Sequence, residues 1–259
     1  MKPTLFSRAS FISVAFVAVA LSSTGASAAV KATVLHSFSG PPDGLMPTTN
    51  LIADPAGNLY GTTPEGGANS NGYCEQNCGV AFELSPTANG VQETVLYNFC
   101  SLAGCADGAD GGFPFAGITL DSSSGDLFGT TMQGGNSNCP PGCGVVFELT
   151  PGSSGWTEHV LYAFSDDASG EYPYGGLIIG PQGRLYGTTY FGGTNGKDGV
   201  VFELIPTRAG SWEEKALSFG SKFGSQPIAS LTLGALGQVY GTTSVGGAGH
   251  GGVVFEITK

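Results

Sequence analysis

Six cysteines are the first residues of this sequence whose type and spacing could do chemistry. They lie in close pairs, namely Cys74 and Cys78, Cys100 and Cys105, and Cys139 and Cys143. Closely spaced thiols either form disulfides or hold a metal such as zinc. The first and last spacings are C-x3-C and the middle one is C-x4-C, with no histidine nearby, so we predict disulfides rather than zinc. Several connectivities are possible, and the recurrence of a close pair favours bonding within each pair.

Carboxylates form the second group. The densest stretch is 107–112, which reads Asp-Gly-Ala-Asp-Gly-Gly. Clustered carboxylates beside glycine suit calcium, which takes oxygen ligands, so Asp107 and Asp110 are the candidate metal ligands. The stretch lacks the alternating Asp ladder and the closing Glu of a dedicated calcium loop. We therefore expect solvated acidic turns and no cofactor, with calcium as the alternative.

Motifs of known catalytic sites are not found in the sequence. His36, His159 and His250 each stand alone, and no G-x-S-x-G, H-E-x-x-H or phosphate-binding loop occurs. With 9 basic and 20 acidic residues, the chain has a formal charge of −11. Phosphate backbones select basic surfaces, so nucleic acid is not an expected partner. An enzyme that assembles its site from separate loops would leave no motif, so catalysis stays open as an alternative.

The part of the sequence that must position these residues consists of one unit repeated four times. The run LYGTT at 59–63 returns as LFGTT at 127–131, LYGTT at 185–189 and VYGTT at 239–243. After a diglycine follow GVAFEL at 79–84, GVVFEL at 144–149 and 199–204, and GVVFEI at 252–257. A third run reads VLHSF at 34–38, VLYNF at 95–99, VLYAF at 160–164 and ALSF at 216–219. A fourth run begins after Pro47, Pro114, Pro173 and Pro227.

Four short runs per unit, separated by turn residues, predict an all-β protein of four-stranded sheets repeated radially, a β-propeller. The 44 glycines supply the positive φ that such turns need. Blades are expected at about 48–99, 114–164, 173–219, and 227–259 plus 33–38. The strand at 34–38 would complete the last blade and close the ring, and the strand order resembles that of NHL-type propellers. A four-bladed monomer is expected, with two chains in an eight-bladed ring as the alternative.

The N-terminal residues are expected to be a targeting signal. Lys2 and Arg8 precede an apolar run at 11–21, and Ala26-Ser27-Ala28 fits the small-residue pattern that signal peptidase cleaves. The run has about 11 residues, too few to span a bilayer, which needs about 20. We expect residues 1–28 to be a signal peptide and 29–259 to be one secreted repeat domain. Periplasmic and extracellular locations both stay open.

Residues that recur in every unit are expected to serve the fold. These include the Glu of each F-E-L/I run and the Gly-Thr-Thr triplets, while Trp156 and Trp212 are expected to pack before the outer strand. Function is expected where the repeat is interrupted, because loops carry function. Antiparallel geometry places one set of loops on a common face, called the loop face below. It comprises 39–47, 64–78, 100–114, 132–143, 165–173, 190–198, 220–227 and 244–251, and it holds all six cysteines.

The four Y/F-G-T-T-x-x-G-G blocks and the four G-V-V/A-F-E-L/I blocks are similar to those of the choice-of-anchor tandem-repeat GloVer family of secreted bacterial proteins. The resemblance runs from about Val34 to Ile257. It implies a surface or extracellular protein and brings no biochemical activity with it. We expect a secreted, non-catalytic module that binds an extracellular protein or a glycan. The alternative is a metal-assisted hydrolase, lactonase or lyase that uses the acidic loop face.

Overall fold

The computed structural model divides the chain into two units, Met1–Thr33 and Val34–Lys259. It describes residues 31–69, 77–102, 109–135, 139, 141–165, 168–194, 198–220 and 223–258. The predicted signal peptide at 1–28 lies outside these residues, as do Cys74, Cys105 and Asp107. Among the described residues, no helix has the length and apolar character needed to cross a membrane.

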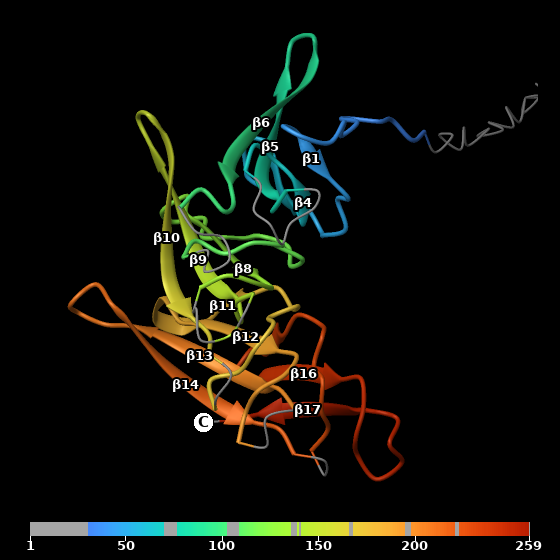
Figure 1. The fold of residues 1–259 in the computed structure, drawn as a ribbon, viewed down its shortest axis with the longest axis vertical. Coiled ribbons are helices and arrows are strands. Elements are labelled where there is room, and N and C mark those ends of the chain that lie inside the picture. Colours follow the sequence, from blue (N-terminus) through green and yellow to red (C-terminus); the bar gives the residue numbers. More distant parts are fainter. Residues whose placement is uncertain are drawn as a thin grey trace, which may run out of the picture. The chain divides into compact units, whose positions relative to one another are not determined.

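Among its described residues the second unit is all-β, as predicted, and its strands form five antiparallel sheets. Figure 1 shows the path of the chain through them. The first sheet consists of β2 (Ile52–Ala53), β3 (Leu59–Thr63), β5 (Val80–Thr87) and β6 (Gly90–Asn98). The second consists of β7 (Thr119–Leu120), β8 (Leu127–Thr131), β9 (Val145–Gly152) and β10 (Gly155–Ala163). The third consists of β11 (Ile178–Ile179), β12 (Leu185–Thr189), β13 (Val200–Pro206) and β14 (Trp212–Ser218). The fourth consists of β15 (Thr232–Leu233), β16 (Val239–Thr243) and β17 (Val253–Ile257).

The fifth sheet is small and has a counterpart in each of the later repeats. It pairs β1 (Gly44–Leu45) with β4 (Glu65–Gly66). The later repeats form single bridges in the same place, between Gly112 and Gln133, Glu171 and Phe191, and Ser225 and Val245. Each repeat therefore ties the loop before its innermost strand to the loop after its second strand. A short 3-10 turn, η1 (Pro181–Gly183), joins β11 to β12.

The predicted strand order within a unit is confirmed for the first three sheets, and the fourth sheet corrects one prediction. Residues 34–38 form no strand, and the fourth sheet has three strands instead of four. Phe38 packs against Phe82 of the first sheet, with ring centroids 5.0 Å apart. The predicted closure of the last sheet by this segment was therefore wrong in the single chain. The segment leads directly into the first sheet, so burying Phe38 there requires no long loop to close.

The recurring Thr and Glu residues hold the strands in register, as expected. The Thr131 hydroxyl donates to the Gln133 carbonyl at 2.9 Å and accepts the Val145 amide at 3.2 Å, which fixes the turn after β8. Equivalent bonds recur at Thr189 and Thr243. Cross-strand pairs add a second tie. The Tyr186 hydroxyl donates to Glu203 at 2.8 Å, and the Tyr240 hydroxyl donates to Glu256 at 3.0 Å.

Successive sheets pack through aromatic rings. Phe99, just past β6, meets Phe147 of β9 edge to face, with centroids 5.0 Å apart, and both side chains are fully buried. Trp156 joins this first junction, where its ring lies 6.2 Å from that of Tyr60. Trp212 packs into the next junction, between the second and third sheets. The predicted packing role of both tryptophans is confirmed.

In each of the four large sheets, a glycine on the second strand leaves space for the phenylalanine ring of the third strand. A Cβ atom on Gly129 would overlap the ring of Phe147, and one on Gly61 would lie 2.8 Å from the ring of Phe82. The same clash recurs at Gly187 and Gly241. The glycine of the Gly-Thr-Thr triplet is therefore required by ring packing against the neighbouring strand.

We predict that Gly129→Ala lowers the free energy of unfolding by about 1–3 kcal/mol, because Phe147 is fully buried and has no space into which to move. Chemical denaturation measures the change. Gly249→Ala is the matched control, since nothing lies within 4 Å of a Cβ atom there. Equal stability of the two variants would contradict this account of the triplet.

Candidate ligand-binding site

Six aromatic side chains form a connected row, called the aromatic row below, and four of the six lie in loops of the loop face. Its members are Phe113, Phe115, Tyr172, Tyr174, Tyr190 and Phe191. All six are partly exposed. The row crosses from the second repeat to the third through Phe115 and Tyr174, whose centroids lie 5.9 Å apart.

Ring contacts continue along the third repeat. Tyr174 lies 5.5 Å from Tyr190, and Tyr190 lies 4.4 Å from Phe191, both edge to face. Phe191 in turn lies 6.3 Å from Tyr172. Contacts of this geometry stabilise one another and hold the rings in fixed orientations. The row therefore presents a preorganised apolar surface edged by three phenolic hydroxyls.

The repeat backbone explains why these rings meet. Phe113 and Tyr172 precede a proline and have φ of 56° and 55°. Their carbonyls accept the amides of Met132 and Tyr190, both at 3.0 Å, which brings the residue after each Thr-Thr beside them. Positive φ at a non-glycine residue often marks a functional site. Here it recurs at Met46 and Gln226, so the backbone belongs to the repeat and only the aromatic identity is special to the second and third units.

A hollow of about 480 Å³ lies beside the row, lined by Tyr174, Tyr190, Ile228 and Ser244. Burial and the neighbouring Tyr190 raise the pKa of Tyr174. Its hydroxyl therefore stays neutral at physiological pH, where it can both donate and accept hydrogen bonds. The hollow joins flat apolar faces to polar edges, the combination typical of small-molecule sites.

Asp110, the candidate calcium ligand, is fully buried. Its Oδ2 accepts the Tyr97 hydroxyl at 2.8 Å, the Ser101 amide at 2.7 Å and the Ser101 hydroxyl at 3.0 Å. These bonds hold the loop that follows β6. Its Oδ1 has no hydrogen-bond partner among the described residues. The expected solvated turn is therefore wrong at Asp110. Asp107 lies outside the described residues, so calcium binding by this pair stays the untested alternative.

Glu158 of β10 lies near Asp110. Burial, and secondly the charge of Asp110, raise the pKa of Glu158 from 4.5 to about 8. Each carboxyl has one buried oxygen without a partner in the described part of the chain. Two carboxylates that share a buried site favour retention of a proton, so Glu158 is protonated at neutral pH.

Two groups of side chains in the described part of the chain could hold a metal ion by geometry. One comprises His36, Asp43 and Glu93, whose ligand atoms all lie within 4.8 Å of one another. In it, His36 Nε2 lies 3.3 Å from Asp43 Oδ2. The other joins Cys139 and Cys143 to Glu171, but those two cysteines are bonded to each other and offer no thiolate.

The disulfides confirm one predicted pair and correct the other two, because Cys78 and Cys100 come from different predicted pairs. Cys139 and Cys143 are bonded, as expected. Cys78, however, is bonded to Cys100 rather than to Cys74. The hairpin register explains this, because Val80 pairs with Asn98, so the residues two positions further out on each strand face one another. Cys74 and Cys105 lie outside the described residues.

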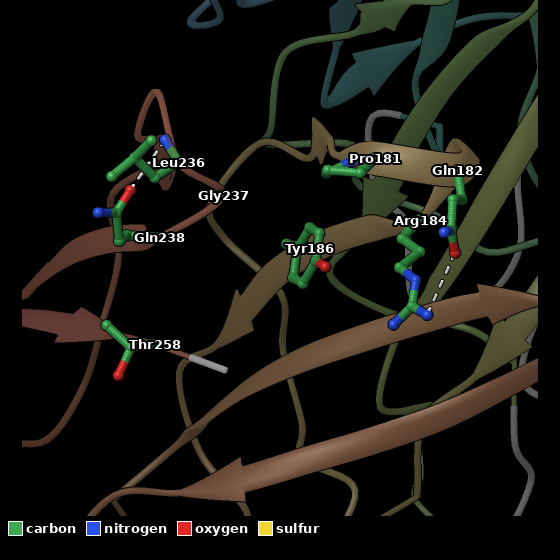
Figure 2. A pocket seen from close by; sticks show the side chains of 8 residues that line it. All are labelled: Pro181, Gln182, Arg184, Tyr186, Leu236, Gly237, Gln238 and Thr258. Carbon is green, nitrogen blue, oxygen red and sulfur yellow. Dashed lines mark hydrogen bonds between the residues drawn. The ribbon is translucent and has the colours of Figure 1, made fainter.

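A second hollow, of about 440 Å³, lies between the third and fourth sheets (Figure 2). Its lining includes Arg184 just before β12, Tyr186 of β12, and Leu236 and Gln238 of the turn between β15 and β16. The Arg184 guanidinium donates to Glu203 at 2.7 Å. Its charged group is thus engaged in holding the sheet, and we do not assign a ligand to this hollow.

The family of this chain follows from its repeat. The model of the Gloeobacter/Verrucomicrobia repeat matches residues 73–259, which is more than half of the chain. The chain belongs to the Gloeobacter/Verrucomicrobia repeat family. The predicted membership of the GloVer repeat family is confirmed. No curated protein matches the chain.

Sequence reasoning selected the loop face and missed the aromatic row. The signal was present, since the residues flanking the recurring proline are aromatic only in the second and third units, where the first has Met46 and Thr48 and the fourth has Gln226 and Ile228.

The raised pKa of Glu158 predicts a pH-dependent stability. Between pH 4.5 and about 8 the folded chain holds a proton that the unfolded chain releases. The free energy of unfolding therefore falls as pH rises through this window, by up to about 1.4 kcal/mol per pH unit from this group. We expect Glu158→Gln to flatten that dependence in denaturation curves between pH 5 and about 8.

Glu213→Gln is the control, because that side chain is 61% exposed and should leave the pH dependence unchanged. A Glu158→Gln variant whose stability follows pH as steeply as the parent would contradict the assignment.

Proposed function

We propose that this protein is a secreted, non-catalytic binding module whose aromatic row binds a carbohydrate. The observation that carries the proposal is the row itself, six connected rings at the edge of the loop face beside a hollow of about 480 Å³. The apolar face of a sugar ring stacks on aromatic faces, while its hydroxyls need donors and acceptors at the edge. Tyr172, Tyr174 and Tyr190 supply both.

Charge narrows the class of glycan. The chain carries 20 acidic and 9 basic residues, and Glu171 adjoins the row through its bridge to Phe191. A negative field repels polyanions and does not oppose neutral or cationic ligands. The proposed ligand is therefore a neutral or amino-sugar oligosaccharide.

The repeated sheets support a β-propeller as the scaffold. A cavity of about 230 Å³ is lined by residues of all four innermost segments, including Leu51, Ile118, Leu177 and Ser230. The Gly176 amide donates to the Ser230 hydroxyl at 2.9 Å across two of these segments. Innermost strands that line a common cavity are what blades around an axis produce.

Export from the cytoplasm is supported by the disulfides Cys78–Cys100 and Cys139–Cys143, because such bonds persist in oxidising compartments. The metal-assisted hydrolase stays an untested hypothesis from the sequence.

Substitution of the central rings tests the binding proposal. We expect the parent chain to bind at least one member of a panel of neutral and amino-sugar oligosaccharides in calorimetry. Tyr174→Ala and Tyr190→Ala should each weaken that affinity about tenfold, close to 1.4 kcal/mol, through loss of stacking surface. Phe223→Ala, an exposed aromatic outside the row (68% exposed), should bind as the parent does. Binding that is unaffected by both tyrosine substitutions, or that is absent across the panel, would refute the proposal.

Cleavage of the N-terminal segment tests export. When the full chain is expressed in a bacterium with a functional secretion system, the protein recovered outside the cytoplasm should begin at Ala29 by N-terminal sequencing. A chain that stays in the cytoplasm with Met1 intact would contradict the proposed location.

A further inference from the structure

The segment before the first sheet reproduces the outer strand of a preceding sheet. Phe38 meets Phe82 at 5.0 Å with an interplanar angle of 68°. The internal junctions show the same contact from the outer strand of one sheet to the third strand of the next. These contacts are Phe99–Phe147 at 5.0 Å and 62°, Phe164–Phe202 at 5.1 Å and 62°, and Phe219–Phe255 at 5.0 Å and 63°.

A second contact repeats in the same place. At the first two of these phenylalanines, the side chain two residues earlier reaches the aspartate of the following loop. His36 Nε2 lies 3.3 Å from Asp43 Oδ2, as the Tyr97 hydroxyl lies 2.8 Å from Asp110 Oδ2. Residues 34–38 therefore sit against the first sheet as an outer strand would, although they have no sheet of their own.

The fourth sheet is missing the strand that residues 34–38 could supply. It lacks an outer strand, and Val254 on its free face is 81% exposed. The equivalent residues Ala81, Val146 and Val201 are at most 4% exposed, because the next sheet covers each of them. A hollow of about 150 Å³, lined in part by Ala216, Leu217 and Ile257, lies beside the position where that strand would run.

The first sheet is uncovered at the matching position. Leu51 is 49% exposed, whereas its equivalents Ile118, Leu177 and Leu231 are at most 6% exposed. Each end of the series therefore exposes a side chain that every internal junction buries. The two ends are the two halves of one more junction of the same kind.

The chain does not form this junction with itself. Residues 34–38 already occupy their place on the first sheet, yet they do not pair with β17 of the fourth sheet. Three fully packed junctions thus leave the two ends apart. We propose that a second copy of this chain binds there, so that two copies exchange contacts at both ends and close one ring of eight sheets.

The third sheet predicts the register of the new strand pair. There Val200 pairs with Ser218 and Val201 with Leu217. By equivalence Val253 of one copy pairs with Ser37 of the other, and Val254 pairs with His36. Each copy gives its N-terminal segment and accepts one on β17, so the assembly has two-fold symmetry and no free edge. This inference does not depend on the ligand proposed above.

Light scattering coupled to size-exclusion chromatography tests the proposal. The parent protein is expected to have twice the mass of one chain. Val254→Lys and Leu51→Lys place a charge in the new junction from opposite ends, and each is expected to give the mass of one chain. Because both positions are exposed in the single chain, the variants should keep the parent's circular dichroism spectrum.

Leu236→Lys is the matched control. Leu236 is 88% exposed and lies in the turn between β15 and β16, outside the junction, so this variant should keep the doubled mass. The proposal is overturned by a parent of one-chain mass at every concentration, by a mass above two chains, or by Leu236→Lys dissociating as Val254→Lys does.

Discussion

The contact on which the structure depends is a phenylalanine of one sheet set edge to face against a phenylalanine of the next. It occurs at 5.0–5.1 Å in all three internal junctions. The receiving ring fits only because its cross-strand neighbour is glycine, as with Gly129 and Phe147. Packing of the two rings in each pair links sheets that no strand pairing joins in the described part of the chain. Each sheet depends mainly on its neighbours, as in other repeat proteins.

The repeat made much of this architecture predictable from the sequence. Strand order within a unit, the structural role of Thr and Glu, and the packing of Trp156 all follow from residues that recur at fixed spacing. Recurrence says nothing about the rotation from one sheet to the next, however. The predicted closure of the fourth sheet by residues 34–38 was wrong for that reason. Closure depends on the sum of the rotations at the three junctions, which no local sequence pattern determines.

The cysteines show a different limit of prediction from the sequence. Pairing within each close pair was inferred from spacing along the chain, whereas the bond from Cys78 to Cys100 follows from strand register. Register could have been derived from the hairpin once its turn was placed. The pair of buried Asp110 and partly buried Glu158 could not have been derived in this way, because it joins the loop before the second sheet to the outer strand of that sheet.

The aromatic row occupies the second and third units and leaves the first and fourth without rings beside the recurring proline. In an assembly of two chains, the rows would therefore recur twice around one axis, separated by units that carry none. A ligand with many identical sugar units could engage both rows at once. Once such a ligand is bound at one row, its binding to the second row would be intramolecular. The strength of that second contact would depend on the effective concentration of the tethered sugar units. Weak binding at a single row would then suffice for firm retention on a polymer.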